Sequence, residues 1–311
     1  MQVLSLLFSL VIACSAFAAQ VFETSDLADV HAKAVEIAPQ YGGSQNVLVV
    51  FDLDNTLLKQ SQSLGSDQWF RWQEDAVLNN KEIPSKVAKD FSELLDVQGV
   101  LFYLSPMEST QSDAPAILSQ LKAKGFAVIA LTSRGMEFRD ATMKHMRNGF
   151  EFSSFGYSGK SSHAFLPYNN QDLSSIGLPA DLDPQIIKSL KLDKPARPVN
   201  FTDGVFFSGG QHKGAMMLAI LHLLSLKPKA VIFVDDQTKH VDRMGQALAL
   251  KPIDLYGFRY SRIDREVQDF ELPDSPEKSR SVFDWENLRN TVKSIFGQKA
   301  LPAEPQAAGV Q

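Results

Sequence analysis

Residues 46–58 read NVLVVFDLDNTLL, and this stretch decides the fold. Its first part, residues 47–51, is an unbroken apolar run in which all residues but Leu48 are β-branched or aromatic. Such a run is typical of a strand buried on both faces, as in parallel sheets. Asp52 and Asp54 follow at the carboxyl end, where open α/β sheets bind their ligands. The stretch predicts an α/β fold with a functional site at this edge of a parallel sheet.

Two carboxylates at the end of a buried strand need a counter-charge. At a separation of about 4 Å they repel each other by about 4 kcal/mol if the effective dielectric constant is near 20. A hard divalent cation such as Mg²⁺ is the usual partner of carboxylate oxygens. Asp and Asn are also ordinary turn residues, so this motif alone is equally consistent with a simple strand-to-turn junction.

Two further apolar runs, 126–131 and 230–234, also end in polar residues, and a lone lysine precedes the second run. The lysine follows two glycines and stands directly before an apolar pattern with helical spacing, so a helix N-terminus is expected beside it. The polar residues in these stretches are Thr132, Ser133, Arg134, Lys213, Asp235 and Asp236.

In this order the motifs resemble those of the haloacid dehalogenase-like phosphatase superfamily, over the sheet-forming parts of the chain. The resemblance implies a Rossmann-like three-layer core with a parallel sheet and a small helical cap inserted after the first strand. It also implies a Mg²⁺-dependent hydrolase that acts on phosphate monoesters. The aromatic residues after the first motif are loosely similar to those of exported class B and class C acid phosphatases.

The resemblance implies a role for each catalytic and phosphate-binding residue. Asp52 is the expected nucleophile, which forms an aspartyl-phosphate, and Asp54 is the expected general acid and base. Thr132 is expected to bind a phosphate oxygen through its hydroxyl, beside the backbone N–H of Ser133. Lys213 is expected to neutralise both the phosphate and Asp52.

The expected metal site involves the same edge of the sheet. The resemblance implies that Mg²⁺ binds Asp52, the backbone carbonyl of Asp54, and Asp235. It implies that Asp236 holds the metal's water or Lys213. Adjacent acids at a strand end are costly without a cation, so this pair supports a metal site independently of the family.

The rest of the chain predicts a core with two inserts. The cap insert contains an aromatic group, Trp69, Phe70 and Trp72, for which packing within a small helical subdomain is favoured over substrate contact. Residues 83–95 have a helical pattern, and residues 99–104 are consistent with a short strand. The expected parts are a signal peptide (1–18), the core (19–58 and 112–297), the cap (59–111), an irregular insert in the core (150–203) and a flexible tail (298–311).

Two residues near the motifs have no settled role. Arg134 is expected either to contact the substrate or to form a salt bridge within the core, and the sequence does not choose between them. His212, next to Lys213, is interpreted as incidental.

The N-terminal residues predict export to the periplasm or the medium. Residues 3–13 are mostly apolar, the small residues Ala16 and Ala18 form a cleavage pattern, and no charge occurs before Glu23. The apolar stretch is too short for a stable membrane span. Cys14, the single cysteine, also lies in a lipoprotein-like box, so a lipid anchor is the alternative. The formal net charge of −5 gives no basic footprint for nucleic acid.

The sequence therefore predicts an exported Mg²⁺-dependent phosphomonoesterase whose partner is a phosphorylated small molecule or another phosphoester. Two alternatives remain: a phosphotransferase that uses the same aspartyl-phosphate, and a catalytically silent binding module that keeps the fold. The complete motif set favours catalysis, and export favours hydrolysis over phosphotransfer.

Overall fold

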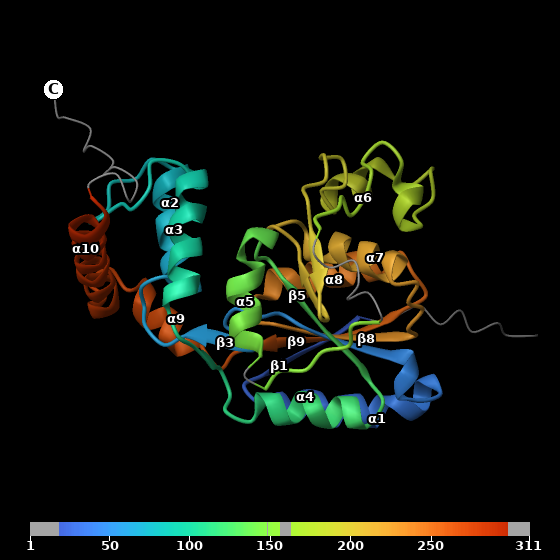
Figure 1. Ribbon diagram of the computed structural model, residues 1–311. Coiled ribbons are helices and arrows are strands. Elements are labelled where there is room, and N and C mark those ends of the chain that lie inside the picture. Colours follow the sequence, from blue (N-terminus) through green and yellow to red (C-terminus); the bar gives the residue numbers. More distant parts are fainter. Residues whose placement is uncertain (1–18, 148, 156–162, 298–311) are drawn as a thin grey trace, which may run out of the picture.

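In the computed structural model, seven strands form a mostly parallel central sheet with helices on both faces, which confirms the predicted α/β, Rossmann-like three-layer fold (Figure 1). The structure describes residues 19–147, 149–155 and 163–297, so the predicted signal peptide and tail lie outside the described residues. The strand order is β1-β9-β8-β2-β5-β7-β6, and only β6 is antiparallel to its neighbour. The strands are β1 (Ala19–Thr24), β2 (Val47–Phe51), β5 (Ala127–Thr132), β6 (Asn200–Thr202), β7 (Val205–Phe207), β8 (Ala230–Asp235) and β9 (Asp254–Tyr260).

Strand β2 lies at the centre of the sheet, between β8 and β5. Its side chains alternate between two hydrophobic clusters, with Val49 and Phe51 in one and Leu48 and Val50 in the other. Helices α1 (Leu27–Ile37) and α4 (Ala114–Ala123) cover the first face, and α7 (Lys213–Leu223) and α8 (Thr238–Leu248) cover the second. Because both faces are covered, the strand is apolar throughout.

The cap is a helical lobe beside the sheet (Figure 1). An antiparallel pair of strands, β3 (Leu58–Gln60) and β4 (Met107–Ser109), connects it to the core, and helices α2 (Asp67–Leu78) and α3 (Phe91–Leu104), which lie between these strands in the chain, form its body. Residues 99–104, expected as a strand, are the last turns of α3. Leu94, Val97 and Leu101 lie on one buried face at helical spacing, so the apolar pattern extends the helix.

Two C-terminal helices, α9 (Asp264–Glu271) and α10 (Pro276–Phe296), complete the cap. Phe270 and Trp285 are buried in the same hydrophobic cluster as Trp69 and Leu94. The sequence assigned these helices to the core, whereas the structure packs them against the insert. The sequence of an amphipathic helix shows that the helix has an apolar face, but it does not show which element covers that face.

The cap aromatics pack as the favoured interpretation predicted. Trp69 is buried, Phe70 packs edge-on against Phe91, and Trp72 packs edge-on against Phe270. These three side chains therefore stabilise the lobe.

The described part of the second insert, which includes α6 (Pro184–Ser189), packs on the core. Leu173, Ile176 and Leu192 belong to the same hydrophobic cluster as α7. The remaining helix, α5 (Arg139–Met146), follows β5. Among the residues that the structure describes, no helix has the length and apolar character needed to span a membrane.

Candidate active site

The polar residues at the ends of β2, β5 and β8 meet at one edge of the sheet. These strands are parallel neighbours, so their carboxyl ends coincide. Phe51 pairs with Ala130 and with Val234, which places Asp52 beside Asp235 and level with the end of β5. The structure thus brings these separate motifs together at one edge of the sheet.

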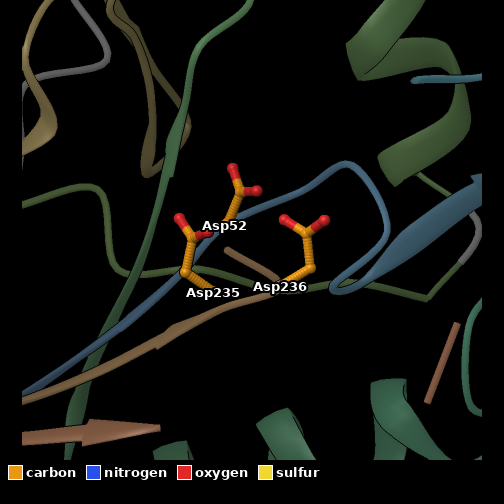
Figure 2. Close-up of side chains that lie close together, drawn as sticks. All are labelled: Asp52, Asp235 and Asp236. Atoms are coloured by element: carbon orange, nitrogen blue, oxygen red, sulfur yellow. The ribbon is translucent and has the colours of Figure 1, made fainter. Parts of the chain in front are cut away.

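Three carboxylates form a buried cluster at this edge (Figure 2). Asp52, Asp235 and Asp236 each offer one oxygen, and these oxygens lie within 4.8 Å of one another. Their residues are 4%, 0% and 8% exposed, so water screens their repulsion poorly. Such a cluster requires positive charge within the site.

Lys213 supplies part of that charge. It is the first residue of α7, its side chain is 1% exposed, and its Nζ lies 2.6 Å from both Asp52 Oδ1 and Asp235 Oδ2. Burial lowers the pKa of Lys213, but the two carboxylates outweigh this effect and hold the pKa above its usual range. The amine is therefore a fixed positive charge between the strands.

His212, expected to be incidental, caps the helix that carries this lysine. Its Nδ1 accepts a hydrogen bond from the Ala215 N–H at 3.2 Å, which satisfies a free donor in the first turn of α7. Burial lowers the pKa of His212 to about 4, so the ring stays neutral and able to accept at neutral pH.

Both oxygens of Asp235 contact protein groups. Its Oδ2 contacts Lys213, its Oδ1 accepts from the Gln237 N–H at 2.9 Å, and His240 Nδ1 lies 3.1 Å from Oδ2. Burial raises the pKa of Asp235, but Lys213 and His240 outweigh it and lower the pKa to about 2. The Lys213 contact that the sequence considered for Asp236 thus belongs to Asp235.

Asp236 has a free oxygen. Its backbone N–H donates to Thr56 Oγ1 at 3.1 Å, but its buried Oδ1 has no hydrogen-bond partner among the described residues. Burial, with the neighbouring Asp235 charge, raises the pKa of Asp236 well above its usual value. Burial likewise raises the pKa of Asp52 to about 8, despite the opposing effect of Lys213. One lysine therefore does not balance the cluster, and a further cation would be favourable.

Asp54 contacts Arg134 instead of the acidic cluster. Arg134 Nε and Nη2 donate to the two carboxylate oxygens of Asp54 at 2.9 and 2.7 Å. The sequence left two roles open for Arg134, substrate contact or a salt bridge within the core, and the structure shows the salt bridge.

The loop after β5 is fixed to the loop after β7. Thr132 is buried, and its Oγ1 accepts from the Arg134 N–H at 3.1 Å. The Ser208 hydroxyl donates to the Thr132 carbonyl at 2.7 Å, and the Gly210 N–H donates to the Ser133 carbonyl at 2.7 Å. The two residues expected to bind phosphate are therefore held in a rigid segment beside Lys213's loop.

The cap approaches the site through the start of α2, which the sequence did not identify. Asn55 adopts a left-handed φ of 58°, and its side chain lies 3.5 Å from Asp67 Oδ2. Arg71 Nη2 lies 3.0 Å from the same Asp67 oxygen. Burial raises the pKa of Asp67, and Arg71 opposes this rise. Ser66 before Asp67 is a helix-cap signal in the sequence, but nothing there indicates its position over the site.

Comparison with known proteins gives two findings. The model of the family described as "Protein of unknown function (DUF2608)" matches residues 23–296, which contain the whole candidate site. A Chlamydia pneumoniae protein named "Putative outer membrane protein" is 22% identical over 270 residues, which cover 86% of each chain.

Proposed function

This chain belongs to the family described as protein of unknown function (DUF2608), and we propose that it is an exported, Mg²⁺-dependent phosphomonoesterase that acts through an aspartyl-phosphate. The observation that carries this proposal is the position of Lys213, buried between Asp52 and Asp235 beside the free oxygen of Asp236. A buried nucleophilic carboxylate with a fixed cation at 2.6 Å is suited to attack an anionic phosphate ester, because the cation offsets the repulsion between the two anions.

In the proposed reaction, one Asp52 oxygen attacks phosphorus while the bond between phosphorus and the ester oxygen breaks. Asp54 supplies a proton to the departing alcohol. Water then attacks the phosphorus of the aspartyl-phosphate, gives a proton to Asp54, and releases inorganic phosphate with the Asp52 carboxylate restored. Thr132 and the Ser133 N–H would bind the phosphate oxygens, and Lys213 would offset their charge.

The residues present fit a divalent cation. The cluster offers the buried Asp236 oxygen that lacks a partner, together with Asp52, and hard cations take carboxylate ligands. We propose Asp52 and Asp236 as ligands, together with the Asp54 backbone carbonyl, which the resemblance to haloacid dehalogenase-like phosphatases implies. Asp235, expected from the sequence as a direct ligand, also offers an oxygen to the cluster and stays a candidate ligand, while its contact with Lys213 holds that amine in place. When bound, Mg²⁺ would supply positive charge for the transferring phosphoryl group.

Export is part of the proposal. Residues 1–18 have the pattern of a secretory signal peptide, with lipid attachment at Cys14 as the alternative. The name of the Chlamydia pneumoniae relative is compatible with export. Mass spectrometry of the mature protein distinguishes a chain starting near Ala19 from one carrying lipid on Cys14.

The decisive test is hydrolysis of a chromogenic phosphate ester, with and without excess chelator, followed by Mg²⁺ addition. We expect activity that the chelator abolishes and Mg²⁺ restores. Asp52→Asn should abolish turnover, and Asp236→Asn should raise the Mg²⁺ concentration for half-maximal activity by at least about tenfold. Asp242 is an exposed acid on α8, so Asp242→Asn is the matched control. It should change neither the turnover nor the Mg²⁺ concentration for half-maximal activity.

Each contrary result identifies the part that fails. Full activity in excess chelator contradicts the metal, and turnover by Asp52→Asn contradicts the covalent mechanism. A wild-type protein that binds Mg²⁺ but hydrolyses no ester in a panel of phosphorylated metabolites supports the binding module instead.

A further inference from the structure

Arg134 is the one motif residue that the proposed reaction leaves without a task, although it is among the most buried charges in the chain. Its side chain is 2% exposed, whereas that of its partner Asp54 is 21% exposed. A buried guanidinium is costly unless its donors are all used well. Its surroundings therefore indicate what it does.

All three nitrogens of Arg134 already donate within the protein. Nε and Nη2 bind the two oxygens of Asp54 at 2.9 and 2.7 Å, and Nη1 donates to Thr142 Oγ1 at 2.8 Å. The Thr142 hydroxyl in turn donates to the Phe138 carbonyl at 2.8 Å. A paired fork of this kind fixes both the position and the plane of a carboxylate, which a lysine cannot do.

The face of the guanidinium is fixed as well. Its central carbon lies 3.9 Å from the centre of the Phe102 ring, within the range of a cation–π contact. Phe102 packs edge-on against Phe138, and its carbonyl oxygen lies 3.1 Å from His145 Nε2. Arg134 is thus held from its edge and its face, which leaves it no freedom to turn toward a phosphate.

Phe102 also connects Arg134 to the cap. It lies in the last turn of α3, whose other face, with Leu94 and Leu101, forms the hydrophobic cluster of the cap. Phe102 itself packs with Phe138 and Ala141 of the core. The junction between cap and core therefore lies directly on the guanidinium that holds Asp54.

We propose that Arg134 is a positioning residue, which orients the Asp54 carboxylate, and that this orientation depends on the packing of α3 against the core. The inference rests on the proposed function, in which Asp54 moves the proton. Arg134 then acts only through Asp54 and contributes to turnover rather than to phosphate binding. Loosening of the Phe102 contact has the same effect in weaker form.

A double-mutant cycle on hydrolysis of the chromogenic ester tests this inference. Arg134→Gln should lower kcat by about 10²-fold, the cost of a misplaced catalytic group, and change KM by no more than about threefold. In an Asp54→Asn background the same substitution should add less than about threefold. Acid-quenched peptide mass spectrometry should find phosphoryl-Asp52 accumulating in Arg134→Gln as in Asp54→Asn, because water activation suffers in both.

Arg280→Gln is the control, since Arg280 also binds an aspartate, Asp284, through Nε but lies exposed on α10. It should leave kcat and KM unchanged. If Arg134→Gln does not fold, Arg134→Lys and Phe102→Leu replace it in the double-mutant cycle, because both variants keep a buried positive charge at position 134. Arg134→Lys should resemble Arg134→Gln, because it lacks the fork, and Phe102→Leu should lose about tenfold in kcat.

Two results overturn the inference while the proposed function stands. One is a rise in KM at unchanged kcat, which makes Arg134 a substrate-binding residue. The other is a full additional loss in the Asp54→Asn background, which makes its role independent of Asp54. A wild-type protein without esterase activity instead overturns the proposed function, and this inference with it.

Discussion

Replacing Lys213 with methionine should expose the repulsion within the acidic cluster. The substitution keeps an unbranched side chain in the fully buried space but removes the cation that lies 2.6 Å from Asp52 and from Asp235. The three carboxylates have oxygens within 4.8 Å of one another, and charges at that separation repel by about 3 to 4 kcal/mol per pair at an effective dielectric constant near 20. Removal of one partner of a buried pair typically costs about 3 to 5 kcal/mol.

We therefore expect Lys213→Met to lower the free energy of unfolding by about 3 to 5 kcal/mol near pH 8 without divalent cation. The loss should shrink near pH 5. Burial already raises the pKa of Asp52 to about 8 with Lys213 in place, and the pKa of Asp235, about 2 beside Lys213, must rise without it. As the pH falls the cluster takes up protons, and the repulsion that Lys213 offset disappears.

Urea unfolding followed by circular dichroism, in excess chelator near pH 5 and near pH 8, measures this difference. Lys33→Met, which removes an exposed ion pair with Glu36, is the control and should cost at most about 1 kcal/mol at either pH. A Lys213→Met cost below about 1 kcal/mol near pH 8, or an equal cost at both pH values, would refute the reasoning. Added Mg²⁺ should restore part of the loss if the cluster binds it.

Two other predictions concern stability. The folded pKa of Asp52 is raised to about 8 from 3.8, so its contribution to stability is fully present below pH 3.8 and is lost as the pH rises through 8. Asp52→Asn removes that loss of stability. In excess chelator, the melting temperature of the variant minus that of wild type should therefore be larger near pH 8 than near pH 6. The same difference at both pH values would contradict this prediction. Trp285→Ala should destabilise the chain by about 3 to 5 kcal/mol by opening the cap cluster, in contrast to exposed Phe283→Ala, and equal unfolding midpoints for the two variants would count against the shared cluster.

The position of the site was predictable because its residues end apolar strands. In a parallel sheet the carboxyl ends of neighbouring strands coincide, so Asp52, Thr132 and Asp235 had to meet at one edge. Lys213 was predictable from the glycines before it and the helix after it. These inferences needed only local patterns and the geometry of the sheet.

The pairing of charges within the site was not predictable. Asp235 and Asp236 are adjacent, and successive side chains of a strand point in opposite directions, so the sequence does not tell which one faces Lys213. Arg134 and Asp54 lie 80 residues apart, and no local pattern connects them. Contacts between side chains depend on how the elements pack, which the periodicity of each element does not contain.

The helices that form the cap are synthesised at different times. Its first helices, α2 and α3, are made early, but Phe270 and Trp285, which cover them, belong to α9 and α10 and are made later. A chain cut short before residue 264 would still carry each acid of the site, Thr132 and Lys213, yet the side of the cap around Trp69 would lie bare. Bare apolar surface is what chaperones and proteases recognise. A truncated copy would thus expose apolar surface although every residue of the candidate site is already present.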